Sequence, residues 1–137
     1  MVEIERQVIV SDKAKLFFEA HIQGSMNDDV AKLSLFSKEV RFTDIEGRDF
    51  FDCLVKLRQL LEKNQLFILC QGSAKNVYPS RMARDMSSGL KAYSLELGKK
   101  TSIEQLVEIF DPAPVEAVGL IVEQNEFFEK WTKYPKD

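Results

Sequence analysis

The sequence is short of the residues from which catalytic and metal sites are usually built. It has one His and two Cys, whereas a zinc site usually draws its ligands from these residue types at short spacings. Gly-X-Ser-X-Gly, Gly-X-Gly-X-X-Gly and Walker A patterns are all missing. We therefore expect a protein that is not an enzyme and holds no metal or cofactor. A magnesium site made only of carboxylates stays open, although no pair of acidic residues is singled out.

Long apolar runs and a strong charge of one sign are also missing. No run approaches the ~20 apolar residues of a membrane span, and the first residues lack the basic and then apolar pattern of a signal peptide. Two Cys in apolar surroundings do not make a disulfide framework. We expect a cytoplasmic protein that does not bind membranes. With a net charge of −3, the chain also lacks the broad cationic field that direct nucleic-acid binding needs.

Apolar residues, in contrast, are plentiful. The chain is 45% hydrophobic and has ten Phe, which is enough for the core of one ordinary domain. No internal repeat, low-complexity tract or linker divides it. A single domain over residues 1–137 is the expected organisation.

The first third of the chain alternates between apolar and polar residues, as half-buried strands do. Alternation is clearest over residues 15–23 and returns over 31–43, and the turn formers of 24–29 stand between them. We predict a β-hairpin or meander over residues 15–44, preceded by a short edge strand at Val8–Val10. His21 falls on the polar side of this pattern, so we expect it at the surface.

The best helical pattern runs from Arg48 to Lys63. Apolar residues recur there at intervals of three and four, and the stripe places Leu57 in the core. The segment Thr43–Glu46 has the spacing of a capping box, and Asn64 can take the left-handed turn that closes a helix. Cys53 is expected to be a small core residue of this helix.

The second half of the chain predicts shorter elements. Five apolar residues, Leu66–Cys70, indicate a strand buried on both faces. Residues 91–97 alternate, with Lys91 and Tyr93 on one face and Ala92 on the other, and 106–110 indicates a final strand. Residues from about 120 to 134 are helical in pattern. The fold class is therefore α+β: one domain with a mainly antiparallel sheet, a long helix (about 48–63) packed on it and a C-terminal helix.

The loop over residues 73–88 combines turn formers with apolar side chains and cations. If Ser80 caps a short helix, Arg81 and Arg84 share one face and Met82 and Met86 another. One interpretation is structural: the methionines hold the loop to the core, and Arg84 pairs with a nearby Asp, either residue 85 or 111. Another is a binding loop, in which Tyr and Arg act as interface anchors; a phosphate pocket is a third. The binding residues would be Lys75, Tyr78, Arg81 and Arg84.

This loop and the segments after it also carry a resemblance. The residues are Cys70–Gly72, Asn76–Met86, Gly89, Ala92–Tyr93, Ile109–Asp111, Glu123–Gln124 and Trp131. They resemble a group of small bacterial proteins, the immunity-type proteins encoded beside polymorphic or contact-dependent toxins, over about residues 48–131. The resemblance implies a cytoplasmic, non-enzymatic antidote that binds a toxin domain, often a nuclease, and blocks it. It carries over no individual functional residue.

Two binding surfaces are expected, and the distribution of charge along the chain favours one of them. Residues 66–100 hold six basic and two acidic residues, and residues 101–137 hold three basic and eight acidic residues. A basic nuclease would be met by an acidic surface, so the first expectation is a partner-binding surface drawn from Asp28, Asp29, Asp111, Glu116 and Glu123. The alternative is a small-ligand or nucleotide-binding domain, even an enzyme, that uses the basic loop 75–86.

Overall fold

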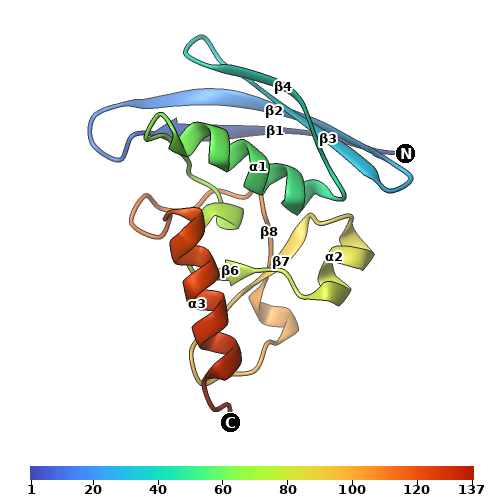
Figure 1. Cartoon of the computed structure of the whole chain (residues 1–137), viewed down its shortest axis with the longest axis vertical. Helices are drawn as coiled ribbons and strands as arrows, with labels where there is room; N and C mark the ends of the chain where they lie inside the picture. Colours follow the sequence, from blue (N-terminus) through green and yellow to red (C-terminus); the bar gives the residue numbers. More distant parts are fainter.

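Antiparallel strands from the first half of the chain make one twisted sheet (Figure 1). The computed structural model describes residues 1–137. The strand order is β4-β3-β2-β1-β5, and the strands are β1 (Val2–Ser11), β2 (Phe17–Asn27), β3 (Val30–Phe36), β4 (Arg41–Gly47) and β5 (Phe67–Ile68). The meander predicted for residues 15–44 is confirmed, with its first turn reduced to Asp28 and Asp29.

The strand predicted at Val8–Val10 is in fact much longer. β1 pairs with β2 over all ten of its residues, and Val10 also pairs with Ile68 of β5. Ile4, Val8 and Val10 point into the core, but Arg6 interrupts the apolar alternation between them. That interruption is why the pattern indicated only a short strand.

One face of the sheet is covered by α1 (Phe50–Glu62). The helix packs against β3, β4 and β5, and Leu54, Leu57 and Leu61 are fully buried. The core positions predicted for Leu57 and Cys53 are therefore confirmed.

The predicted bounds of this helix, about 48–63, are close to those of α1, but the predicted capping residues at both ends are wrong. Thr43–Glu46 belongs to β4, and the cap is Asp49, whose Oδ1 accepts a hydrogen bond from the Asp52 backbone N–H at 2.8 Å. The left-handed residue after the helix is Gln65 (φ 58°) rather than Asn64. Capping residues of the right type stand close together in both places, so type alone could not choose between them.

The apolar run at Leu66–Cys70 is not a central strand. Within the sheet only Phe67 and Ile68 are paired, at its edge, and Cys70 forms an isolated bridge with Pro112. The chain then enters a 3-10 turn, η1 (Gln71–Ser73). Gly72 lets this turn press against α1, because a Cβ there would stand 2.5 Å from Leu54 Cδ2. The run is apolar because it packs under α1, and not because a sheet surrounds it.

The rest of the chain forms a smaller, three-stranded antiparallel sheet, β6-β7-β8. Its strands are β6 (Val77–Tyr78), β7 (Lys91–Ser94) and β8 (Leu106–Glu108); α2 (Arg81–Ser87), a 3-10 turn η2 (Ile103–Gln105) and α3 (Ile121–Lys133) complete the chain. In β7 the buried residue is Ala92, whereas Lys91 is exposed and Tyr93 half-buried. A single cluster of 22 buried apolar residues joins both sheets.

Candidate functional site

The loop over residues 73–88 folds around α2. Ser80 is its cap, as predicted: its Oγ accepts a hydrogen bond from the Ala83 N–H at 3.0 Å. The helix ends in two left-handed residues, Ser88 (φ 58°) and Gly89 (φ 83°). A Cβ at Gly89 would stand 2.7 Å from Asp49 Cγ, so this glycine allows α2 to lie against the start of α1.

Arg84 is a structural residue of this junction. Its Nε and Nη2 donate to the two carboxylate oxygens of Asp49 at 2.8 and 3.1 Å, and both side chains are largely buried, at 16% and 10% exposed. The expected partners, Asp85 and Asp111, are not used. Because a two-pronged pair of this kind neutralises the guanidinium, Arg84 offers little charge to a ligand.

The sequence indicated a packing role for Met82 and Met86 and a binding role for Tyr78, but in the structure the methionines are exposed and Tyr78 is packed. Met82 and Met86 are 71% and 81% exposed, so they do not hold the loop to the core; Val77 and Ala83 are buried instead. Tyr78 lies inside an aromatic stack, 4.0 Å from the Phe128 ring centroid and edge-on to Phe51 at 5.5 Å. It joins α1 to α3, which is a packing role.

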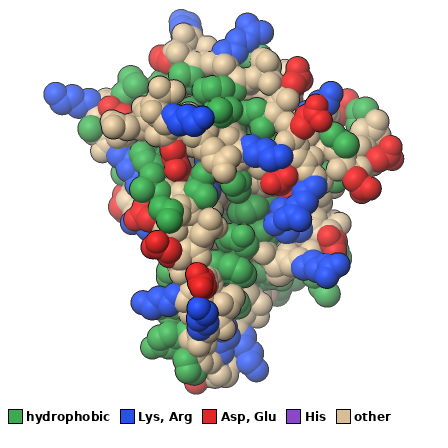
Figure 2. Space-filling view, in the orientation of Figure 1, with side chains coloured by type: hydrophobic (Ala, Val, Ile, Leu, Met, Phe, Trp, Pro, Cys, Tyr) green, Lys and Arg blue, Asp and Glu red, His purple; other side chains and the backbone are tan.

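Arg81 and Arg84 do line a shared cleft. The cleft has a volume of about 660 Å³ and lies between α2, the β2–β3 turn and the start of α1, where Arg48 adds a third cation. Asp29, Asp49 and Asp85 line the same cleft, and Figure 2 shows basic and acidic side chains interleaved over this side of the molecule. The remaining candidate, Lys75, lies elsewhere, 3.9 Å from Glu123. The four residues of the basic loop therefore do not make one cationic site.

The five predicted acidic residues are also divided. Asp28 and Asp29 form the exposed β2–β3 turn, and Asp29 lies beside Arg48 near the start of α1. Glu123 caps the start of α3 by accepting from the Leu120 N–H at 2.8 Å. That point is tied to the far end of α1 through Glu62. Since a helix of 13 residues is roughly 20 Å long, the two acidic groups lie at opposite ends of α1.

Asp111 and Glu116 lie nearer to Glu123 in the chain. Glu116 is exposed in the turn before Ala117. Asp111 follows the buried Phe110 and lies close to Arg6 of β1. The hydrogen bond from Arg6 to Glu108, and more weakly the charge of Asp111, raise the pKa of Arg6. Asp111 therefore lies near β1, on the side of the large sheet opposite to β4.

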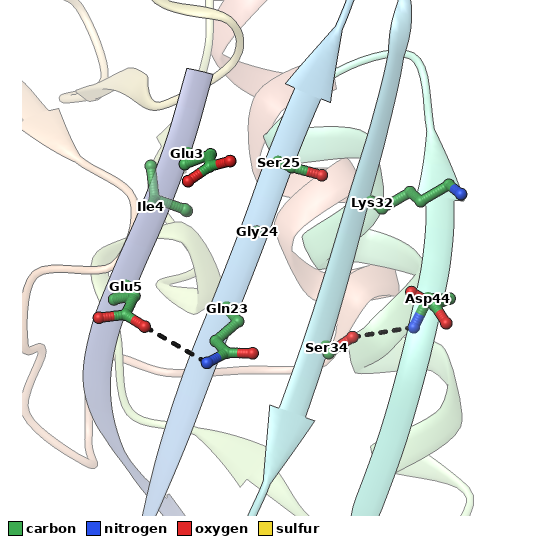
Figure 3. A pocket seen from close by; sticks show the side chains of 9 residues that line it. All are labelled: Glu3, Ile4, Glu5, Gln23, Gly24, Ser25, Lys32, Ser34 and Asp44. Atoms are coloured by element: carbon green, nitrogen blue, oxygen red, sulfur yellow. Dashed lines mark hydrogen bonds between the residues drawn. The ribbon is translucent and has the colours of Figure 1, made fainter. Parts of the chain in front are cut away.

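The uncovered face of the large sheet carries a more continuous set of acidic residues. No helix lies on this face (Figure 1). Its strands turn mostly polar side chains outward, together with the exposed apolar residues Ile9, Phe17 and Val30. A shallow hollow of about 630 Å³ lies on this face. Figure 3 shows the residues that line it, among which Glu5 Oε1 accepts a hydrogen bond from Gln23 Nε2 at 3.3 Å. The outward carboxylates are Glu3, Glu5, Glu19, Asp44 and Glu46, against the cations Lys32 and Arg41.

Sequence reasoning missed this surface because its carboxylates are spread over 44 positions of the chain. Only the strand register brings them together: Lys32 stands opposite Glu46, and Glu5 opposite Gln23. The usable signal was the outer side of the alternation in residues 3–7 and 17–27. Asp28 and Asp29 extend the same surface at one end of β2 and β3.

The His and Cys side chains of the molecule do not form a cluster. His21 is on the uncovered face, where its Nδ1 lies 3.0 Å from Gln7 Nε2. Burial raises the pKa of the Cys53 thiol to about 12 and also raises the pKa of Cys70. No three His, Cys, Asp or Glu side chains stand close enough to hold a metal ion, and none of the helices has the length and apolar character needed to span a bilayer.

Comparison with known proteins adds no family. No protein-family model and no curated protein matches the chain.

Proposed function

We propose that this chain is a non-enzymatic protein-binding module that recognises a basic partner through the uncovered face of its large sheet. The observation that carries the proposal is the set of five outward carboxylates against two cations on that face. Complementary charge of this kind speeds encounter with a basic partner and selects against acidic ones.

The face is also suited to binding because its strands are already held in the folded sheet before a partner arrives. Its reverse side forms the core with Ile22, Leu33 and Leu35, all fully buried. A surface that does not have to be ordered on binding avoids the entropy cost that flexible loops carry. Four strands about 4.8 Å apart and roughly seven residues long cover on the order of 400 Å². A standard interface takes about 800 Å² from each partner, so neighbouring residues such as Asp28, Asp29 and Asp111 would complete it.

An immunity-type role accounts for the separation of the packing residues from the proposed binding surface. The segments that resemble such proteins supply packing residues here: Tyr78 in the aromatic stack, Ser80 as a cap and Arg84 as the partner of Asp49. The acidic face comes from residues 3–46, outside the resemblance. Antidotes that share a scaffold and bind different toxins need a binding surface that can vary independently of it. The partner proposed is thus a basic toxin domain, of which a nuclease is the leading example.

The test is co-expression with the products of the genes that flank this protein's own gene. If one of them is toxic, the chain should restore growth and should elute with it as one complex. A charge-reversed face, Glu3→Lys with Glu5→Lys and Asp44→Lys, should lose both effects. As a control, the reversal of two exposed carboxylates outside the face, Glu116→Lys with Glu126→Lys, should keep them. A toxic neighbour that the chain neither binds nor neutralises would refute the proposal.

A second candidate function rests on the cleft beside α2. Arg48 and Arg81 line it and form no salt bridge there, so a small anionic ligand has two cations to meet. The carboxylates of Asp29 and Asp85 oppose it, which makes this the weaker candidate. Titration with inorganic phosphate and with a nucleoside triphosphate, followed by calorimetry, tests it. Binding that Arg81→Gln abolishes would favour the cleft; no heat with either ligand would remove it.

A further inference from the structure

β1 has an edge that no strand covers for most of its length. β2 pairs with it on one side from Val2 to Ser11, whereas β5 pairs with it on the other side only at Val10 and Ser11. The Leu69 N–H adds one bond to the Ile9 carbonyl at 2.8 Å, and the chain then leaves the sheet. Figure 3 shows the Glu3–Glu5 part of β1 with β2 beside it.

The backbone groups along this edge are therefore free to pair. In an antiparallel ladder, successive residues turn their N–H and C=O groups to opposite sides. Ile9 is bonded toward β5, so Glu3, Glu5 and Gln7 face the same open edge, while Ile4, Arg6 and Val8 bond to β2. No backbone hydrogen bond outside the regular strands reaches these three residues. One side chain bonds to their backbone: Arg6 Nη1 donates to the Glu5 carbonyl at 2.9 Å. Because a carbonyl oxygen has a second lone pair, it can still accept a hydrogen bond from an added strand.

Carboxylates flank the edge on both sides of the sheet. Glu3 and Glu5 lie on the uncovered face, and Glu108, paired with Arg6, lies on the other side with Asp111 nearby. Where β5 ends, a small hollow of about 90 Å³ opens between Leu69, Phe110 and Pro112. That is about three times the share of one water in the liquid, roughly 30 Å³, which leaves room for one small apolar side chain.

We propose that the free edge of β1, from Glu3 to Gln7, receives an extended basic strand of the partner protein. The strand would continue the sheet where β5 stops. It would pair with the backbone of Glu3, Glu5 and Gln7, place lysine or arginine side chains beside Glu3 and Glu5, and seat one small apolar side chain against Phe110. The inference rests on the proposed function and specifies how the partner engages the acidic face; strand addition of this kind is a recurring mode of recognition.

Charge selects this occupant over a second copy of the chain. If the whole free stretch from Glu3 to Gln7 paired antiparallel with the same stretch of a second copy, Glu5 would stand opposite Glu5. Like charges directly opposite each other destabilise a strand pair. The same carboxylates protect the edge from self-association, as charges on edge strands commonly do. A basic strand is the one pairing that they favour.

Amide hydrogen exchange followed by NMR tests the pairing directly. The probe is an acetylated nine-residue peptide of alternating lysine and valine; the control alternates lysine and proline, which keeps the charge but cannot form a strand. In the free protein, the Glu5 and Gln7 amides should exchange fast and those of Arg6 and Val8 slowly. At saturation the lysine–valine peptide should slow Glu5 and Gln7 at least tenfold, and the control less than twofold. Equal effects of the two peptides, or binding without protection of these amides, would overturn the inference, as would no binding.

Proline substitutions separate backbone pairing from charge. Glu5→Pro removes an N–H that faces the open edge, so the domain should fold and the peptide should no longer bind. Ile4→Pro removes an N–H bonded to β2 and should destabilise the domain. Glu5→Gln should only weaken peptide binding. If Glu5→Pro fails to fold, Gln7→Pro and the exchange pattern of the wild type still decide. A partner that binds Glu5→Pro normally but not the charge-reversed face would defeat the edge inference and leave the proposed function standing.

Discussion

Arg58 is buried in the core without a carboxylate partner. It is 3% exposed, and its guanidinium donates to Gln124 Oε1 at 2.6 Å and to the carbonyls of Gly72 and Gly119 at 3.2 and 3.1 Å. Gln124 Nε2 in turn lies 2.9 Å from the carbonyls of Gly72, Ala74 and Val77. Burial lowers the pKa of Arg58. These two side chains tie α1, η1 and α3 together.

Replacement of Arg58 by Met should therefore be costly. It keeps much of the side-chain volume but removes three hydrogen bonds and leaves buried oxygens unsatisfied, so we expect a loss of about 2–5 kcal/mol in the free energy of unfolding. Arg48→Met, at an exposed position, is the matched control and should change it by less than about 0.5 kcal/mol. Urea denaturation of both variants gives the comparison. A loss below about 1 kcal/mol for Arg58→Met would show that the cluster does not hold the elements together.

Cys53 should make stability fall at alkaline pH. Its Sγ lies 3.4 Å from the carbonyl oxygens of Ala31 and Ile45, and burial raises its pKa from 9.0 to about 12. The unfolded thiol ionises first, so its contribution is complete below about pH 9 and is lost as pH rises toward 12. The free energy of unfolding of the wild type should fall more steeply over that range than that of Cys53→Ala, by up to about 1.4 kcal/mol per pH unit. Parallel curves would contradict this.

At the scale of elements, one residue joins two helices. Asp49 caps α1 through the Asp52 N–H and also binds Arg84 of α2. A double-mutant cycle with Asp49→Asn and Arg84→Met should give a coupling free energy of about 1–3 kcal/mol, measured by urea denaturation. Arg81→Met, on the same helix but exposed, should couple to Asp49→Asn by less than about 0.5 kcal/mol. Equal coupling for the two arginines would mean that the pair has no special part in the junction.

Elements with a clear period could be predicted from the sequence, and the short strands β7 and β8 also lie within the strands predicted at residues 91–97 and 106–110. The meander and α1 follow from alternation and from the leucine stripe, because each buries one face over many residues. The prediction of a central strand at Leu66–Cys70 was wrong because a run of apolar residues packed under a helix has the same sequence pattern as a strand buried on both faces. Ser80 could be recognised as a cap because capping is local, whereas the partner of Arg84 stands 35 positions away in the chain.

The whole molecule should unfold as one cooperative unit, since one cluster of 22 residues spans both sheets. Trp131, the only tryptophan, reports on the smaller sheet side, where its Nε1 donates to the Glu96 and Lys99 carbonyls. Circular dichroism reports mostly on the large sheet and α1. In urea the two signals should give the same midpoint. Separate midpoints would indicate two independently folding parts.

The sequence predicted an acidic binding surface, and of the five residues named for it only Asp28 and Asp29 adjoin the uncovered sheet face. An acidic surface was predicted from Asp28, Asp29, Asp111, Glu116 and Glu123, and these residues lie at different ends of the fold. The carboxylates of the uncovered sheet face are distant in sequence, and nothing local in the chain marks which face of a strand stays open. Pairing register and the position of α1 decide that, and both are properties of the whole molecule.

The central claim is that the acidic sheet face binds a basic partner, and association kinetics test it most directly. Once the partner is identified, its association rate constant should be measured at low and high salt for the wild type, for the charge-reversed face and for Arg81→Glu. In Glu3→Lys with Glu5→Lys and Asp44→Lys, association at low salt should slow at least tenfold and lose most of its salt dependence. Arg81→Glu should change it less than twofold. An unchanged rate in the face variant together with a collapse in Arg81→Glu would contradict the account.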